Sequence, residues 1–180
     1  MLFEIMEGAA CAINEYQIVV SGGVNSNRKN SDILQIYNIR ENQWRLFEIC
    51  LSTPRRQVTM VSSQKDRVMI LGGLESDGSE SRIVEEIDFI KRNIVTLPLL
   101  KYGRAAPSAF QVNDTIYVFG GTGALSVINK DLTTTSDPSL EIVIGEKFVL
   151  RENKWREVVS RSKCSSAALG TMQMLMEPGT

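Results

Sequence analysis

The sequence predicts an all-β fold made of repeated four-stranded antiparallel sheets. Two observations lead to this prediction. Three double glycines recur along the 180 residues at intervals of 50 and 48 residues, and each of them directly follows a short apolar run. Periods of this size are typical of repeat architectures, and short apolar runs of this kind are typical of strands. The pairs are Gly22-Gly23, Gly72-Gly73 and Gly120-Gly121.

A second pattern follows each double glycine. In the first two units an aromatic or apolar residue stands 14 residues after the second glycine, and in the third unit it stands 27 residues after it. In every unit another such residue follows seven positions later. These pairs are Tyr37 and Trp44, Ile87 and Ile94, and Phe148 and Trp155. We expect them, with the glycines, to form the core of the repeat, where glycine lets a ring approach the backbone closely.

The elements of each unit follow in order. A first strand precedes a polar turn, a second strand ends at the double glycine, and the third and fourth strands carry the apolar pair. The predicted strands are 9–13, 17–21, 33–38 and 44–47; then 58–62, 67–71, 84–90 and 94–97; then 107–112, 116–119, 147–150 and 155–158. These give a first unit over 9–47, a second over 58–97 and a third over 107–158, with a partial fourth over 164–176 in a single region spanning 1–180.

This arrangement of glycine pairs, aromatic positions and tryptophans resembles the kelch repeat. The resemblance covers nearly the whole chain, although Ile94 stands where the family pattern has a tryptophan. It implies a β-propeller, in which four-stranded blades are arranged radially in a ring. We expect Trp44→Ala and Trp155→Ala to lower the thermal stability, because both rings should lie between sheets.

The ring is expected to be incomplete. At about 50 residues per blade the chain supplies roughly three and a half blades, whereas propellers have about four to eight. The exposed end faces should then be covered by a partner that completes the propeller. A four-bladed ring closed by the termini is the alternative.

The longer loops should all emerge on one face, the usual place for binding residues on a rigid scaffold. The loop 122–146 is the longest of them. Cationic residues recur where the first strand of each unit begins, and arginine suits carboxylates of a partner protein. These candidate partner-binding residues are Arg55, Arg56, Arg104, Arg161 and Lys163. The alternative is that they pair with acidic residues inside the scaffold.

Composition argues against several classes of function. The net charge of −1 gives no electrostatic reason to expect binding to nucleic acid or to a membrane. The chain has no histidine and only three cysteines, so we expect no metal site, no cofactor and no histidine-based catalysis. Few cysteines also favour a cytoplasmic protein.

These observations together predict a non-enzymatic protein-interaction or scaffold module, a subunit of a larger assembly such as a cytoskeletal or ciliary one. The substrate-recognition part of a ubiquitin ligase adaptor is one alternative. A carboxylate-based enzyme or a sugar-binding propeller is an alternative of another class.

Overall fold

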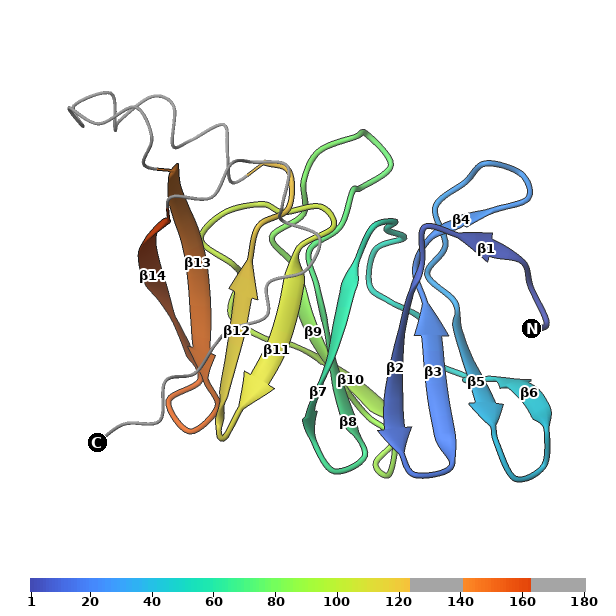
Figure 1. Cartoon of the computed structure of the whole chain (residues 1–180). Helices are drawn as coiled ribbons and strands as arrows, with labels where there is room; N and C mark the ends of the chain where they lie inside the picture. Colours follow the sequence, from blue (N-terminus) through green and yellow to red (C-terminus); the bar gives the residue numbers. More distant parts are fainter. Residues whose placement is uncertain (124–140, 163–180) are drawn as a thin grey trace.

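The computed structural model describes residues 1–123 and 141–162, which form three four-stranded antiparallel sheets and one two-stranded sheet (Figure 1). The first sheet contains β2 (Ala9–Asn14), β3 (Gln17–Ser21), β5 (Leu34–Asn38) and β6 (Gln43–Leu46). The second sheet contains β7 (Thr59–Gln64), β8 (Arg67–Leu71), β9 (Val84–Asp88) and β10 (Asn93–Thr96). The third sheet contains β11 (Ser108–Val112), β12 (Thr115–Phe119), β13 (Glu141–Val149) and β14 (Lys154–Ser162).

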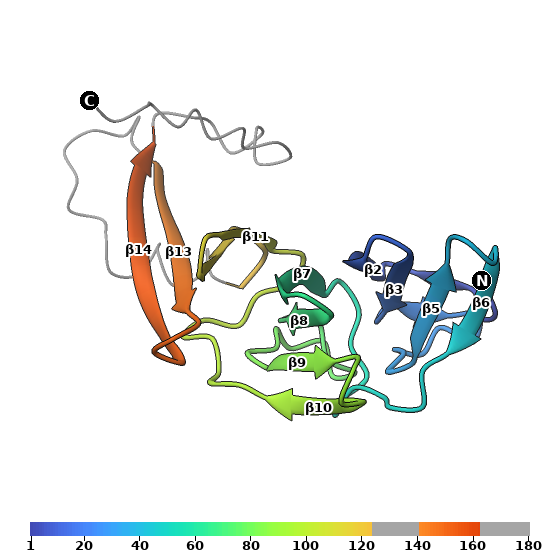
Figure 2. The same cartoon turned by 90° about the horizontal axis from the view of Figure 1, so that it is seen from below.

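The three sheets are arranged like a fan. In each sheet the strands are hydrogen-bonded in chain order. Figure 2 shows that β2, β7 and β11 lie closest to one another, while β6, β10 and β14 lie at the outer rim. The predicted all-β fold, an incomplete ring of antiparallel blades, is therefore confirmed. The predicted fourth unit over 164–176 lies outside the described residues.

The seven-residue spacing of the apolar pairs results from a hairpin. Tyr37 lies directly opposite Trp44 on the paired strands β5 and β6, and Phe148 lies opposite Trp155 on β13 and β14. The ring centroids are 5.0 Å apart in both pairs, with interplanar angles of 36° and 44°. Directly opposed aromatic residues of this kind stabilise a strand pair. Ile87 and Ile94 occupy the same positions in the second sheet.

Apolar cores fill the spaces between neighbouring sheets. The core between the first and second sheets contains Leu34 and Ile36 of β5 and Val68 and Ile70 of β8, all exposed by 1% or less. Because side chains alternate along a strand, the other residues of β8 point to the opposite face of the second sheet. There Met69 and Leu71 join Ile116, Val118 and Phe148 in the core between the second and third sheets. The second sheet is therefore covered on both faces.

The strands of the third sheet differ from the prediction at its outer edge. β13 begins at Glu141 instead of 147, and β14 continues to Ser162 instead of ending at 158. Residues 141–146 are thus strand, and only part of the expected 122–146 loop remains, of which 124–140 lie outside the described residues. The apolar β-branched run Ile142-Val143-Ile144 explains the difference, because such residues favour strands and can prolong the hairpin.

The Tyr37–Trp44 pair lies on the face of the first sheet that points away from the second sheet. Ile36, the neighbour of Tyr37, belongs to the core with the second sheet, so Tyr37 points the other way. The expectation that both tryptophans lie between sheets therefore holds for Trp155 and is wrong for Trp44 in the described structure. Trp155 packs against the core between the second and third sheets. It donates a hydrogen bond from Nε1 to the carbonyl oxygen of Pro98, at 2.8 Å.

This difference predicts unequal effects of the two tryptophan substitutions. Trp155→Ala should lower the free energy of unfolding by about 3 kcal/mol, because it removes packing between two sheets. Trp44→Ala should cost about half as much, because Trp44 packs on Tyr37 within one sheet and not between two sheets. Urea denaturation monitored by circular dichroism measures both, with Trp155→Phe as a control that keeps the ring stacking. Equal losses for the two alanine variants would contradict this assignment of the faces.

Candidate interaction surfaces

The double glycines let the connecting segments between sheets pass close to the strand ends. A Cβ atom at Gly22 would lie 3.0 Å from the carbonyl oxygen of Arg55, and one at Gly72 would lie 2.4 Å from that of Arg104. Both glycines also have positive φ, 69° and 61°, where other residues are strained. The close approach is thus to the backbone of the next connecting segment and not to an aromatic ring, which corrects the expectation from the sequence.

Arg55 enters the second sheet from the connecting segment and is completely buried. Its guanidinium forms an ion pair with Glu85 of β9 and donates hydrogen bonds to the carbonyl oxygens of Gly72 and Ile83, at 2.9 and 3.0 Å. The same carboxylate accepts a hydrogen bond from the backbone N–H of Ser52, at 2.9 Å. Burial lowers the pKa of Arg55, and the charge of Glu85 opposes part of that shift. The pair thus joins the connecting segment to the middle of its own sheet.

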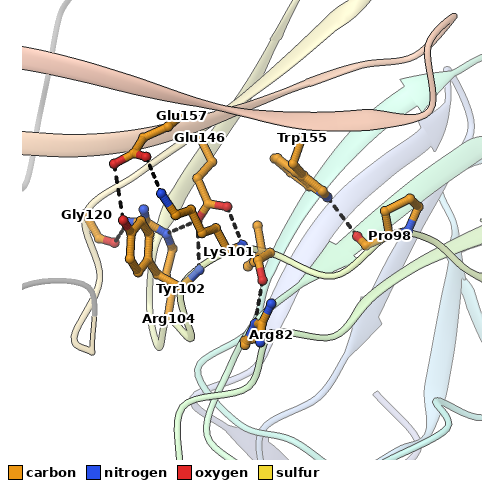
Figure 3. Close-up of polar contacts among 10 residues, drawn as sticks. Arg82, Pro98, Lys101, Tyr102, Arg104, Gly120, Glu146, Trp155 and Glu157 are labelled. Carbon is orange, nitrogen blue, oxygen red and sulfur yellow. Dashed lines mark hydrogen bonds and ion pairs between the residues drawn. The ribbon is translucent and has the colours of Figure 1, made fainter. Parts of the chain in front are cut away.

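Arg104 repeats this arrangement in the third sheet (Figure 3). Its Nε lies 3.1 Å from Oε1 of Glu146 on β13, and both side chains are fully buried. Arg104 also donates to the carbonyl oxygen of Gly120, at 2.8 Å, and Glu146 accepts from the backbone N–H of Lys101, at 2.5 Å. A buried pair with this many hydrogen bonds fixes the position of the connecting segment against the strands.

The N-terminal residues form the corresponding segment in front of the first sheet. There β1 (Ile5–Met6) pairs with β4 (Val24–Asn25) in a two-stranded sheet that the sequence did not predict. Equivalent bridges show the correspondence between segments: Met6 with Val24, Arg56 with Leu74, and Ala105 with Thr122. The residues just before these are Ile5, Arg55 and Arg104, so Ile5 takes the position of the buried arginines.

A neutral glutamine takes the place of the buried glutamate in the first sheet. Gln35 of β5 is fully buried at the position of Glu85 and Glu146. Its Oε1 accepts hydrogen bonds from the backbone N–H groups of Leu2 and Phe3, both at 2.9 Å. Gln35 therefore holds its segment through backbone hydrogen bonds, whereas Glu85 and Glu146 also pair with a buried arginine. This pattern could have been found in the sequence by aligning the third strands of the units.

The buried positions change the set of candidate partner-binding residues. Arg55 and Arg104 are not available to a partner, because their side chains are enclosed by the scaffold. Arg56 remains partly exposed and pairs with Glu7 at 3.2 Å, with 36% and 42% of the two side chains exposed. Arg161 lies in β14 opposite Ile142, and Lys163 lies outside the described residues.

A second ion pair lies beside Arg104 on the surface (Figure 3). The ammonium of Lys101 and the hydroxyl of Tyr102 both donate to the carboxylate of Glu157 on β14. The hydrogen bond to Glu157 raises the pKa of Lys101 to about 12, and that from Lys101 lowers the pKa of Glu157. The connecting segment before the third sheet is thus fixed at its surface as well as in its interior.

We call the face that carries the longer loops, at the top of Figure 1, the long-loop face. Two of its loops, 24–32 and 74–83, share one backbone pattern. The N–H of Asn25 donates to the carbonyl oxygen of Lys29, at 2.9 Å, as Glu75 donates to Ser79 at 3.0 Å. Arg28 occupies the positive-φ position that Gly78 occupies in the second loop.

The tips of these two loops carry opposite charges. Arg28 and Lys29 are exposed on the first loop, and Asp77 and Glu80 are exposed on the second. Asn30 donates from Nδ2 to the carbonyl oxygen of Leu74, at 3.0 Å, and so joins one loop to the other. The long-loop face therefore presents a basic and an acidic tip side by side on a rigid base.

A hollow of about 580 Å³ opens on the opposite face, where the short turns lie. Turn residues of the first two sheets line it, and the Asn14 side chain donates to Asp66 across the two sheets at 2.8 Å. The guanidinium carbon of Arg40 lies 3.3 Å from the ring centroid of Tyr16, a cation–π contact within this lining. No local sequence pattern predicts this hollow, because its residues come from three separate turns.

The radial sheets and their joined connecting segments define an incomplete β-propeller. Comparison with protein families matches residues 7–47, the first sheet and its entry, to the Kelch motif. The second and third sheets repeat the strand order and register of that unit. No curated protein matches the chain as a relative. Within the described residues, no helix is long and apolar enough to cross a membrane.

The replacement of the ion pair in the first sheet predicts how the second sheet responds to substitution. Glu85→Gln should lower the free energy of unfolding by about 3 kcal/mol, because it leaves the Arg55 charge buried without a counter-charge. Adding Arg55→Ile recreates the residues of the first repeat and should recover most of that loss. Urea denaturation of the single and double variants measures the coupling.

Glu7→Gln is the matched control, because it removes the partner of the adjacent Arg56 at the surface. It should change stability by less than about 1 kcal/mol. The losses in free energy of unfolding for Arg55→Ile and Glu85→Gln could instead add up to the loss in the double variant. Arg55 and Glu85 would then not be coupled, which would contradict this description of the buried pair.

Proposed function

We propose that the chain is a non-enzymatic protein-interaction module that binds a partner protein through its long-loop face. Kelch repeats in general mediate contacts between proteins, and the Kelch motif match supports a role of this general kind. The observation that supports binding through the long-loop face is the pair of loops with the same backbone pattern and opposite charges. A rigid scaffold that presents different side chains on equivalent loops is suited to selective recognition of a partner.

The contact residues in this proposal are Arg28 and Lys29 on the basic tip, Asp77 and Glu80 on the acidic tip, and Arg56 between the loops. A partner surface with an acidic patch beside a basic one would complement them. Rim charges of this kind affect selectivity and the association rate more than the total affinity.

We also propose that the protein is cytoplasmic and serves as a subunit of a larger assembly. Cys11 and Cys50 are both free thiols, as is usual in a reducing compartment. Burial raises the pKa of Cys11, which favours the protonated and less reactive thiol.

Charge reversal at the loop tips tests the proposed binding face. The full chain is used as bait, and captured proteins are identified by cross-linking and mass spectrometry. For a partner that cross-links to residues 24–32 or 74–83, the double variants Arg28→Glu/Lys29→Glu and Asp77→Lys/Glu80→Lys should weaken binding by about tenfold or more.

The double variant Lys65→Glu/Lys91→Glu is the matched control. It reverses the same number of positive charges on the opposite face and should leave binding unchanged. Loss of binding in this control, with retention in both loop variants, would place the contact at the turn face and contradict the proposal.

A further inference from the structure

The outward face of the first sheet is apolar although no sheet of the described residues covers it. Its residues are Ala10, Ile18, Val20, Tyr37, Ile39 and Trp44, all partly or fully exposed. At the corresponding positions, Val68, Ile70 and Ile87 in the second sheet and Ile116 and Val118 in the third are 0% exposed. They are buried because the preceding sheet packs against them. The first sheet therefore presents a surface that the same fold buries twice elsewhere in the chain.

The outward face of the third sheet carries large aromatic side chains. Phe110, Tyr117 and Phe119 stack there, with ring centroids 5.7 Å apart for Phe110 and Tyr117 and 5.9 Å apart for Phe110 and Phe119. The corresponding residues of the second sheet are Val61, Met69 and Leu71, which are exposed by 7%, 0% and 0%. Their counterparts in the third sheet are only half-buried.

The two end faces also match in side-chain size. In the core between the first and second sheets, Met60 of β7 packs in a cluster with the small residues Ala9 and Cys11 of β2. In the next core, Val61 of β7 shares a cluster with Ala109 of β11. On the outward face of the first sheet, the small Ala10 stands at the position of Met60 and Ala109. On the outward face of the third sheet, the large Phe110 stands at the position of Val61.

From these observations we propose that two copies of this chain pack head to tail, the outward face of the first sheet of one copy against the outward face of the third sheet of another. This names the partner that extends the incomplete ring, and it is independent of binding through the long-loop face. The contact is heterologous, so copies close into a ring if the rotation permits and otherwise form a longer assembly.

The backbone at each end fits the same arrangement. The N–H of Gln57 donates to the carbonyl oxygen of Glu7, at 2.8 Å, and the N–H of Ala106 donates to that of Gln57, at 2.7 Å. These three residues all have positive φ and hold equivalent places in the repeats. The next donor in this series is the N–H of Glu7 and the next acceptor is the carbonyl oxygen of Ala106, which head-to-tail packing brings together.

The surroundings of Gly120 in the described structure fit the same arrangement. A Cβ atom at Gly22 or Gly72 would collide with the next connecting segment, whereas no atom of the described residues lies within 4 Å of the corresponding point at Gly120. In the proposed contact, the Ile5 carbonyl of the second copy lies there, as those of Arg55 and Arg104 lie against Gly22 and Gly72.

A mixing experiment with the full chain tests the head-to-tail contact. Sedimentation velocity over a range of concentrations should show self-association of the wild-type chain. Ile18→Glu on the first-sheet face and Tyr117→Glu on the third-sheet face should each weaken self-association by about tenfold or more. An equimolar mixture of these two variants should form a complex of one copy of each, because one intact contact remains between them.

Two further variants complete the experiment. Ile90→Glu changes a residue that is 74% exposed and lies on neither end face, so it should self-associate like the wild-type chain. Gly120 has a φ of 66°, so Gly120→Ala should lower thermal stability moderately as well as weaken association. It replaces Tyr117→Glu in the mixture if that variant does not melt cooperatively.

Three results would overturn the proposal. A wild-type chain that is monomeric at all concentrations would show that another blade or the chain itself covers these faces. A mixture of the two variants that stays monomeric would exclude the heterologous contact. Self-association that Ile18→Glu abolishes and Tyr117→Glu leaves intact would indicate contact between two first-sheet faces. None of these results bears on the long-loop face, whose variants are tested separately.

Discussion

The structure depends on the burial of apolar sheet faces against neighbouring sheets. The apolar side chains that alternate along the strands gain their stabilisation from removal from water, so each four-stranded sheet needs at least one covered face. Only the second sheet has both faces covered by other sheets of the described chain. The first and third sheets each keep one apolar face toward solvent, and this asymmetry explains why Trp44 and Trp155 form the same local pair in different surroundings.

The connecting segments set the geometry in which the faces meet. Each segment passes over a glycine without a Cβ and is held by a buried polar side chain on the third strand of its own sheet. In the second and third sheets this side chain is a glutamate paired with Arg55 or Arg104, whereas in the first sheet it is the neutral Gln35, which binds the backbone of Leu2 and Phe3. Replacing a buried ion pair by residues that leave no unpaired charge is often nearly neutral for stability. The chain therefore contains two chemical solutions to the same positional requirement.

Much of the fold could be predicted from the sequence because its signals are local and repeated. The double glycines, the Asn- and Asp-containing turns and the seven-residue spacing each report on a hairpin within one sheet. The length of β13 and β14 is not predicted, because the repeat pattern rests on Phe148 and Trp155, and the β-branched run before them falls within the expected 122–146 loop. The β1–β4 pair was missed because two-residue strands leave no periodic pattern.

The candidate site was harder to predict from the sequence. Arginine recurs before the first strands of the second and third sheets, whereas Ile5 stands at this position in the first sheet. Arg55 and Arg104 are buried, and only their pairing with the third strand reveals it. That pairing joins residues 30 positions apart for Arg55 and 42 for Arg104, distances set by loops of different length. Exposure of the loop tips and the hollow at the turn face depend on how separate turns meet, which no local pattern shows.

Native-state hydrogen exchange of the backbone amides tests most directly whether coverage by neighbouring sheets controls stability. The comparison is between β8, where Val68–Leu71 are all fully buried, and the equivalent strands β3 and β12, measured at low protein concentration. The account predicts that the hydrogen-bonded amides of β8 exchange most slowly, because both faces of the second sheet must be uncovered to open it. Exchange from β3 and β12 that is as slow as from β8 would contradict it.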